Sequence, residues 1–484
     1  MAKTPGDDGV PTPRPTANTQ SIGPLGSITL EPDDGKVVPR KQVISWAFWD
    51  WATQPFNSVI LTFVFASSYL VSANFLPTDV AALAEDDPIK EQALAGLSSS
   101  YGLVTTIAGI LILLLAPVLG QRADATGRKK GALLLFTGIL ALLQFGLFFI
   151  HAEPGYFWAG AAILALGAVV SEIAGVNYNA MLHQVSTRRT IGRVSGLGWG
   201  LGYIGGIIAL AIIVIITFAD WFGLDTSDGL AYRLIAVGCA VWTILFSIPI
   251  FLNVPEAPAV DAEHRKVNFF ASYVLLVKDL IRLFRTSKPA FWFLFASAVY
   301  RDGLAGVFAF GGVLAAVAFH FSPTEVIIFG IAANVVAGIS TIFAGRADDR
   351  FGPKAVIVFS LVGLVIMALV VFAFHDLGTV VFWTGGLLLS AFVGPAQAAS
   401  RSLLARVTPV GLQGEIFGLY ATTGRVASFM SPAMWTLFIA ISGSTIFGVL
   451  GIAIVLLVGL VLLILVKLPD LRVGTHSELP GALD

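Results

Sequence analysis

Two short stretches decide the fold: Gly120-Gln-Arg-Ala-Asp124-Ala-Thr-Gly127-Arg128-Lys129-Lys130 and Gly345-Arg-Ala-Asp-Asp349-Arg350-Phe-Gly352-Pro-Lys354. Glycines at the first and eighth positions, an aspartate at the fifth and a lysine at the tenth recur 225 residues apart. Glycine permits a tight turn and close helix packing. An aspartate can face a neighbouring helix N-terminus, where a carboxylate is favoured. The matched copies predict an internal duplication.

Long apolar blocks surround both copies. The 484-residue chain is 56% hydrophobic and only 12% charged, whereas soluble proteins carry about 25% charged residues, so a soluble enzyme is excluded. A membrane helix needs about 20 mostly apolar residues, and these blocks are too long for barrel strands. We therefore predict an all-α membrane protein with twelve transmembrane helices, at residues 43–75, 97–119, 131–150, 156–181, 195–218, 231–252, 290–316, 325–344, 355–374, 379–400, 415–440 and 446–466.

Basic residues predict the orientation. With the N-terminus inside, 25 of the 29 lysines and arginines fall in inside segments, among them 401–414, and only Lys90 falls in an outside segment. Positive charge concentrates on the cytoplasmic side of membrane proteins, so we expect both termini in the cytoplasm of a cell-membrane protein. The net charge of −1 indicates no nucleic-acid partner. A single cysteine, Cys239, excludes a disulfide within the chain.

The repeat divides the twelve blocks into two pseudo-symmetric sets of six, an arrangement found in many transporters. We predict a disordered cytoplasmic tail at 1–41, a six-helix half at 42–252 and a cytoplasmic linker at 253–289. A second six-helix half follows at 290–467, and then a cytoplasmic tail at 468–484. Within the linker, residues 268–284 are amphipathic. They predict a helix on the inner membrane surface, with a plain soluble linker helix as the alternative.

The two opening stretches resemble the signature loop of the major facilitator superfamily, and the resemblance covers about residues 42–467. The first copy has Ala125 where the family has a basic residue, while the second keeps Arg350. The resemblance implies the major facilitator fold. It assigns eight residues to two gating loops: Gly120, Asp124, Gly127, Arg128, Gly345, Asp349, Arg350 and Gly352.

A narrower resemblance comes from segments within the helices. They are similar to the "unknown major facilitator" family, which is related to autophagy-linked vacuolar amino-acid effluxers. That similarity implies transport of an organic solute and, more specifically, amino-acid efflux. The segments that carry it are Trp46–Ala52, Asn177–Ala180, Tyr300–Gly303, Gly394–Ser402 and Glu415–Tyr420.

Five charged residues fall inside predicted helices: Asp50, Glu172, Arg301, Asp302 and Arg425. A charge at the middle of a membrane helix costs at least about 2.5–3.5 kcal/mol, so each is a candidate to bind the solute or a proton. The family resemblance places the first, fourth, seventh and tenth helices around a central cavity, and four of the five lie on those helices. Four polar residues complete the predicted substrate and proton-coupling set: Gln54, Asn57, Asn179 and Gln397.

Each charged residue also has a structural interpretation. Asp50 could be tied to a neighbouring helix near the cytoplasmic interface, with Trp46, Trp49 and Trp51 forming an aromatic belt. Arg301, Asp302 and Arg425 could form structural ion pairs, Arg425 with Asp302 or Asp50. Glu172 is a proton-coupling candidate because a carboxyl group in an apolar cavity binds a proton more readily than one in water. Its alternative is a contact between helices.

A proline and several lines of small residues bear on how the helices can move relative to one another. Pro55 removes a backbone hydrogen bond and is expected to loosen the first helix. Small residues at four-residue spacing predict close packing of one helix against another. Such a contact, here called a seam, either slides during transport or stays static. The small residues form two lines on the fifth helix, Gly192, Gly196 and Gly200, and Gly198, Gly202 and Gly206, with Gly330, Ala333, Ala337 and Gly338 on the eighth.

These observations predict a secondary active transporter rather than an enzyme. The six histidines show no metal-binding spacing within a helix, and no phosphate-binding loop of a primary pump occurs. The expected partners are a small-molecule solute, the lipid bilayer and protons as the coupling ion, with no metal or cofactor and a monomeric chain. A drug or metabolite exporter of the same fold is one alternative. A non-transporting receptor or a channel is another.

Overall fold

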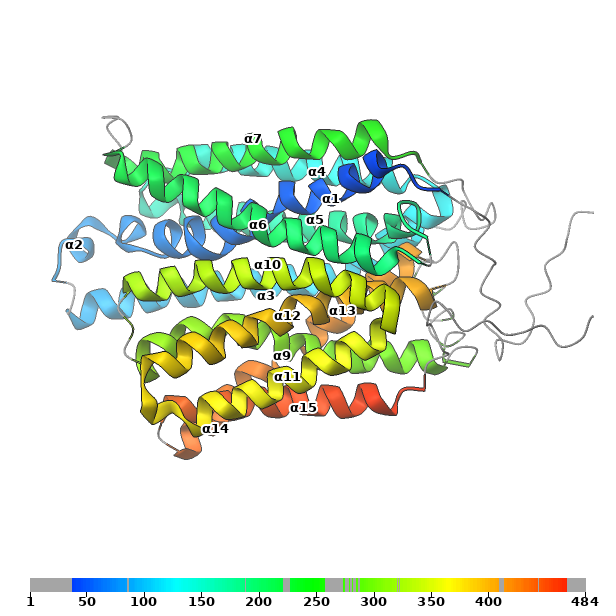
Figure 1. Ribbon diagram of the computed structural model, residues 1–484. Helices are drawn as coiled ribbons and strands as arrows, with labels where there is room; N and C mark the ends of the chain where they lie inside the picture. The colour runs from blue at the N-terminus through cyan, green and yellow to red at the C-terminus, as the bar shows by residue number, and fades with distance from the viewer. Residues whose placement is uncertain are drawn as a thin grey trace, which may run out of the picture.

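The computed structural model describes residues 37–84, 87–187, 189–220, 227–256, 288–319, 321, 323–408, 413–442 and 444–467, with 273–274, 278, 281 and 284–285. Its architecture is helical (Figure 1). The α-helices are α1 (Arg40–Pro55), α2 (Thr78–Ala81), α3 (Pro88–Thr126), α4 (Lys129–Gly146), α5 (Phe157–Ala180), α6 (Ile191–Phe218), α7 (Leu230–Asn253), α9 (Lys288–Ala318), α10 (Pro323–Phe351), α11 (Pro353–Ala373), α12 (Thr379–Val407), α13 (Gln413–Ala427), α14 (Met430–Ser442) and α15 (Gly448–Leu465).

Ten of the helices in the described segments are long and apolar enough to cross a membrane: α3 to α7, α9 to α12, and α15. Two further paths are interrupted helices. After Pro55, α1 continues as two wider π-helical segments, Phe56–Phe63 and Phe65–Leu70. The missing N–H of proline explains this change, which confirms the expected loosening of the first helix. The second path consists of α13 and α14, which are separated by residues 428–429.

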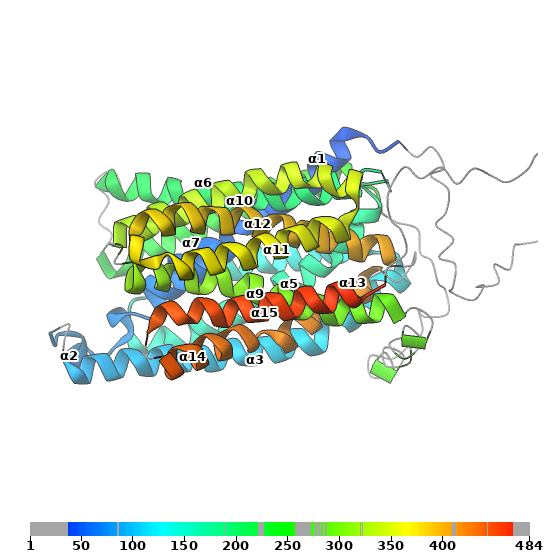
Figure 2. The ribbon, with the colours of Figure 1, turned by 60° about the horizontal axis from the view of Figure 1, so that its bottom comes forward.

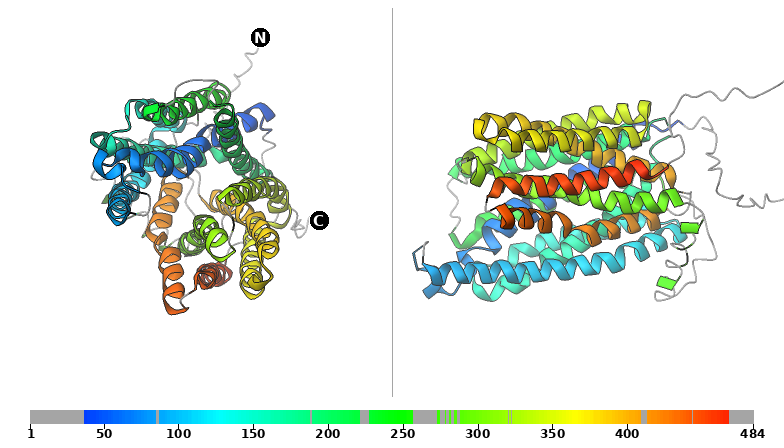
Figure 3. Two further views of the ribbon diagram at one scale, coloured as in Figure 1. Left: turned by 90° about the vertical axis from the view of Figure 1, so that its left-hand side faces the viewer. Right: turned by 90° about the horizontal axis from the view of Figure 1, so that it is seen from below.

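The helices form an N-terminal group, α1 to α7, and a C-terminal group, α9 to α15, lying side by side along one axis (Figure 1). The two groups meet where α6 packs along α10 and α3 packs along α13, as Figures 1 and 2 also show. The left panel of Figure 3 looks along the bundle and shows the helices of both groups end-on. We call the end of the bundle where α1 begins and α7 and α15 end the base.

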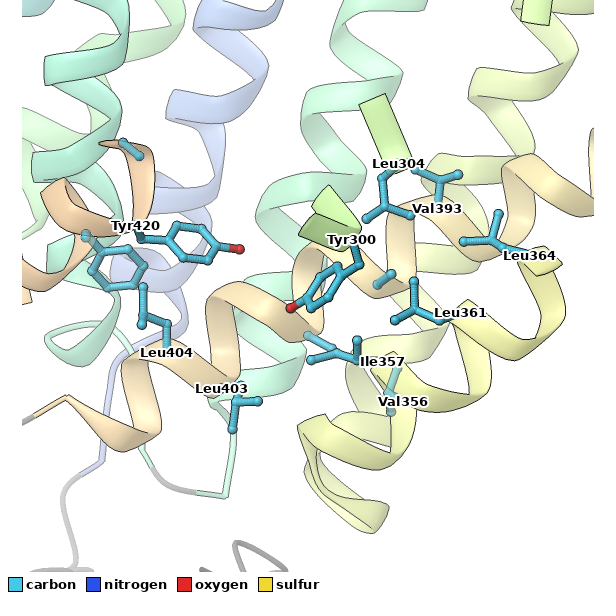
Figure 4. Close-up of a cluster of buried hydrophobic side chains, with 14 of the residues drawn as sticks. Tyr300, Leu304, Val356, Ile357, Leu361, Leu364, Val393, Leu403, Leu404 and Tyr420 are labelled. Atoms are coloured by element: carbon cyan, nitrogen blue, oxygen red, sulfur yellow. The ribbon is translucent and has the colours of Figure 1, made fainter. Parts of the chain in front are cut away.

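Aromatic and branched apolar side chains fill the inside of each group. Figure 4 shows Tyr300 of α9 beside Ile357 and Leu361 of α11, and all three side chains are fully buried. Inside a membrane, helices are held together by van der Waals packing of such side chains and not by removal of apolar surface from water. The helices of a group are therefore fixed relative to one another, which gives the polar side chains between the groups a rigid support.

Several predicted segments fall outside the described residues. They include most of the tail at 1–41, the tail at 468–484 and most of the linker at 253–289, with its amphipathic stretch. Several helix boundaries differ from the sequence prediction. The first helix begins at Arg40 rather than at residue 43, and α12 continues to Val407, beyond the expected end at residue 400. α3 covers Pro88–Thr126 rather than 97–119, and α10 continues to Phe351 rather than ending at residue 344.

Candidate functional site

The two signature stretches form matching turns. Gly127 lies between α3 and α4, and Gly352 lies between α10 and α11. Their φ angles are 66° and 86°, in the left-handed region that favours glycine. This confirms the predicted tight turns. In the first stretch Gly120 is buried and Arg128 is exposed, while the side chain of Asp124 lies outside the described set.

Asp349 binds the first turn of α6 across the interface between the groups. Its carboxylate accepts hydrogen bonds from the backbone N–H groups of Gly192, at 2.8 Å, and Arg193, at 3.1 Å. It also accepts bonds from the side chains of Arg193, at 2.9 Å, and Arg406, at 3.2 Å. A carboxylate is stabilised at a helix N-terminus by the free N–H groups and the helix dipole. The expected contact is therefore confirmed for Asp349. Arg350 points elsewhere and is exposed.

Each group has a lysine that binds the C-terminal end of its last helix, but the two lysines are not the pair that the sequence repeat predicts. Lys130 Nζ donates to the carbonyl oxygens of Phe251 and Val254 at the end of α7. Lys354 Nζ makes the same contacts at the end of α15, with Ile464 and Val466. Lys354 is therefore equivalent to Lys130, although the sequence register pairs it with Lys129. The reason is that α4 begins two residues after its turn glycine and α11 begins one residue after it.

The first glycine line of α6 packs against α10. A Cβ atom on Gly196 would lie 2.7 Å from the carbonyl oxygen of Thr341, and one on Gly200 would lie 3.0 Å from that of Gly338. Only residues without side chains allow helices this close. Gly330, nearer the start of α10, has open space around its Cβ position. The seam between α6 and α10 is therefore closed at Gly196 and Gly200, on the side of the base.

The second glycine line of α6 packs against three polar residues of α1 and the π-helical segment that continues it: Asp50, Gln54 and Ser58. A Cβ atom on Gly198 would lie 2.8 Å from Asp50 Oδ2, and one on Gly206 would lie 2.7 Å from Ser58 Oγ. Gln54, between them, donates from Nε2 to Ser58 Oγ at 3.2 Å. The glycines thus bring Asp50 and Gln54 against α6. Asn57 is exposed.

Arg401 of α12 connects the two groups near the base. It donates to Asp50 Oδ2 at 3.2 Å and to Asn179 Oδ1 at 3.1 Å. It also donates to the hydroxyl and carbonyl oxygens of Ser195, at 3.0 and 2.6 Å. The hydroxyl of Tyr178 donates to the same oxygen of Asp50 at 2.9 Å. We call these five residues the Arg401 cluster. Since α1, α5 and α6 belong to the N-terminal group, one side chain of α12 binds three helices of the opposite group.

Aromatic rings enclose the Arg401 cluster. Tyr178 lies between Trp46 and Trp49, with ring centroids at 4.3 and 4.4 Å. The guanidinium carbon of Arg401 lies 5.1 Å from the Trp46 ring and 5.6 Å from the Trp199 ring, within range of a cation–π interaction. Trp46 and Trp49 are buried and pack against the cluster. The alternative interpretation of an aromatic belt is therefore wrong for these two residues, whereas the tie between Asp50 and neighbouring helices is confirmed.

Sequence reasoning missed Arg401 as a site residue. Charge counting assigned it to an inside loop, whereas it lies within α12 with only 5% of its side chain exposed. The small residues Ala398, Ala399, Ser400 and Ser402 flank it. They were the signal that the helix continues, because small side chains permit close packing around a long one. Arg401 also ends the Gly394–Ser402 segment that carries the family resemblance.

Other predicted site residues lie above the cluster, away from the base. Gln397, one turn before Arg401 on α12, accepts a hydrogen bond from the hydroxyl of Tyr203 at 2.6 Å. Glu172 lies on α5 seven residues before Asn179, which belongs to the cluster, so the two share a helix face. Both are partly exposed. The side chain of Arg425 lies outside the described set, so its expected pairing with Asp302 or Asp50 is not tested.

Arg301 and Asp302 are directed to different neighbours. Arg301 Nη1 donates to the carbonyl oxygen of Tyr420 at 2.8 Å, and its guanidinium lies 3.7 Å from the centre of the Tyr420 ring. Asp302 Oδ2 accepts the backbone N–H of Ser431 at 2.6 Å. Ser431 lies in the first turn of α14. Asp302 therefore stabilises the N-terminus of α14, just after the break that separates it from α13.

Two groups of membrane helices, matched turns and polar contacts between the groups are the features expected of a transporter of the major facilitator superfamily. The chain belongs to the family described as "Vacuole effluxer Atg22 like", which it matches over residues 38–473. This confirms the resemblance seen in the sequence. Members of this class move solutes and are not enzymes.

Individual relatives agree with this assignment. The chain is 30% identical over 434 residues to the uncharacterized MFS-type transporter YxiO of Bacillus subtilis (strain 168), covering 87% of this chain and 94% of YxiO. It is 25% identical over 400 residues to a gentisate transporter of Corynebacterium glutamicum, covering 79% and 83% of the two chains. The solved structure of the human organic anion transporter MFSD10 shares the fold, with a TM-score of 0.64, 15% identity and coverage of 88% and 99%.

Proposed function

We propose that the chain is a secondary active transporter that exports a small organic solute across the cytoplasmic membrane by alternating access, with amino acids as the first class to test. The proposal includes twelve membrane crossings in two six-helix halves, at 42–252 and 290–467. The interrupted helices at 40–70 and 413–442 supply the first and eleventh crossings. Both termini and the base then face the cytoplasm, as the basic residues predict.

One observation carries the proposal: the Arg401 cluster joins the two halves near the base. Alternating access requires halves that separate first at one end and then at the other. Asp50 and Arg401 lie on opposite halves and touch at 3.2 Å. Asp349 and the first turn of α6 form a second contact of this kind. Both contacts must break before the base can open, so they are suited to act as a gate on the cytoplasmic side.

Proton coupling is part of the proposal and has its own candidates. Asp50 and Glu172 are carboxylates on partly exposed helix faces within the bundle. Protonation of Asp50 would remove the charge that Arg401 pairs with, which links proton binding to opening of the base. Asp302 is the third predicted candidate, although its bond to Ser431 favours a role in holding α14.

Solute counterflow in proteoliposomes tests the proposal. Purified protein should accumulate labelled amino acid against a preloaded unlabelled pool, and a proton gradient should drive net movement. A receptor would show neither effect, and a channel would show no counterflow. Proton coupling is excluded if transport ignores the gradient and is unchanged in Glu172→Gln, Asp50→Asn and Asp302→Asn.

A metabolite exporter of the same fold is the second candidate, and the similarity to a gentisate transporter favours it. Gentisate is an aromatic acid without an amino group. The same counterflow assay separates the two candidates when labelled gentisate is included. Movement of gentisate without movement of any amino acid would select the second candidate.

A further inference from the structure

Two arginines lie in the same layer of the bundle. The hydroxyl groups of Tyr300 on α9 and Ser400 on α12 are joined by a hydrogen bond of 2.7 Å. Arg301 and Arg401 follow these residues directly in their helices. Their side chains therefore start close to one another, on helices that contact each other. Charged side chains inside a membrane protein are rare and pair with one another or with backbone carbonyl groups, and they mark solute and ion pathways.

The two arginines differ in how their charge is compensated. Arg401 is paired with Asp50. Arg301 uses one of its five N–H donors for the carbonyl oxygen of Tyr420 and stacks on the Tyr420 ring. Among the side chains that the structure describes, no carboxylate lies within 4.0 Å of Arg301. The adjacent Asp302 is turned to the first turn of α14.

Arg301 also faces the right direction for a ligand between the halves. Arg301, Ala305 and Phe308 follow a spacing of four and seven residues, so they share one face of α9. All three are partly or fully exposed. The ring of Phe308 contacts that of Tyr203 on α6, with centroids 6.2 Å apart. This face of α9 is therefore turned towards the opposite half, where a transported solute has to pass.

We propose that Arg301 binds the carboxylate group of the transported solute, which makes the solute class small organic acids, amino acids included. The inference rests on the proposed transport function. A guanidinium group presents paired N–H donors that match the two oxygens of a carboxylate. The Tyr420 ring and carbonyl oxygen hold one side of the guanidinium, leaving its other donors available. A solute without negative charge would leave this arginine uncompensated.

Ligand-dependent thermal stabilisation of the purified full chain tests the inference with matched probes. Each amino acid is compared with its carboxamide, and gentisate is compared with 2,5-dihydroxybenzamide. At least one acid should raise the melting temperature, with a dissociation constant at least about tenfold lower than that of its amide. In Arg301→Gln this preference for the acid should vanish. If that variant does not fold, Arg301→Lys should weaken acid binding and spare amide binding.

A matched control separates ligand binding from a structural role. Arg233 in α7 makes the same two types of contact, a hydrogen bond to the carbonyl oxygen of Phe148 at 2.7 Å and stacking on the Phe148 ring. It lies within the N-terminal group, so Arg233→Gln should keep the preference for the acid. Equal binding of acid and amide, loss of the preference in both variants, or its retention in Arg301→Gln would overturn the inference. Counterflow of a sugar or amine without binding of any acid would overturn the role of Arg301 but leave the proposed transport function standing. Absence of counterflow for every solute would contradict both the role of Arg301 and the transport function.

Discussion

Replacing Asp50 by Asn should release the base of the bundle. Asparagine keeps the size of the side chain and one acceptor oxygen, but it removes the charge that Arg401 faces at 3.2 Å. Arg401 has only 5% of its side chain exposed, so water cannot replace the lost partner. The contact exists only while the halves are together at the base. Its loss therefore favours the state in which they are apart.

The size of the effect follows from the one hydrogen bond of Asp50 that crosses between the halves. Oδ2 of Asp50 accepts from Arg401 of the opposite half at 3.2 Å, whereas its bond from the Tyr178 hydroxyl, at 2.9 Å, stays within the N-terminal half and is kept on opening. A bond to a charged group is worth about 1.5–3 kcal/mol and a neutral one about 0.5–1.5 kcal/mol. Loss of the carboxylate charge should therefore weaken the bond between the halves by about 1–1.5 kcal/mol. This shifts the equilibrium between closed and open base by about 5- to 13-fold.

Distance measurements between spin labels can detect this shift. Arg189 and Arg346 are exposed residues near the base on opposite halves, and each can be replaced by a labelled cysteine in a Cys239→Ala background. Double electron–electron resonance should give mainly the short distance with Asp50 intact. In Asp50→Asn the ratio of the long-distance to the short-distance population should rise by about 5- to 13-fold.

Arg233→Gln provides the matched control, because its contacts stay within the N-terminal group. It should leave the distance distribution unchanged. The reasoning is refuted if Asp50→Asn keeps the short distance, or if Arg233→Gln produces the same shift. Elution as a single species in both variants rules out unfolding as the cause.

Three further predictions concern stability and closure. Gly196→Leu should prevent closure of the base, because its Cβ atom would lie 2.7 Å from the carbonyl oxygen of Thr341. Gly330→Ala places its Cβ atom in open space and should leave closure unchanged. The same spin-label distances measure closure in both variants. Gly127→Ala and Gly352→Ala should each cost about 1–3 kcal/mol of folding free energy, because an alanine would be forced into a sparsely populated backbone region at φ angles of 66° and 86°. A melting temperature equal to that of the wild type would contradict the turn assignment. Asp302→Asn should lower the melting temperature by weakening the start of α14 while transport retains its solute preference; a changed preference with unchanged stability would argue for a role in binding.

The parts of the account that were predictable from sequence depend on local rules. Gly127 and Gly352 mark turns because few other residues adopt their φ angles. Asp349 was expected at a helix N-terminus because short-range electrostatics favour it there. Pro55 ends the α-helical part of the first crossing because proline lacks an N–H group. Each of these effects acts within a few residues or follows from a repeated pattern.

The missing parts depend on partners far away in the chain. Hydropathy cannot distinguish an arginine in a loop from an arginine inside a helix such as Arg401, whose charge is paired with Asp50 of the opposite half. The acceptor role of Asp302 was equally hidden, because Ser431 lies 129 residues away beside a break between two helices. The one-residue shift that makes Lys354 equivalent to Lys130 could not be seen either. It depends on where each helix begins after its turn.

The central claim is that the halves must separate at the base for a solute to cross. Lys129 and Gln413 lie on opposite halves at the base and are in contact at 2.9 Å. With cysteines at both positions in the Cys239→Ala background, a short bismaleimide can bridge them. Counterflow of labelled amino acids and gentisate in proteoliposomes is then measured before and after bridging. We expect accumulation of at least one solute before bridging and none after it. Counterflow that persists in the bridged protein, or that is absent from the unbridged protein, would contradict the claim.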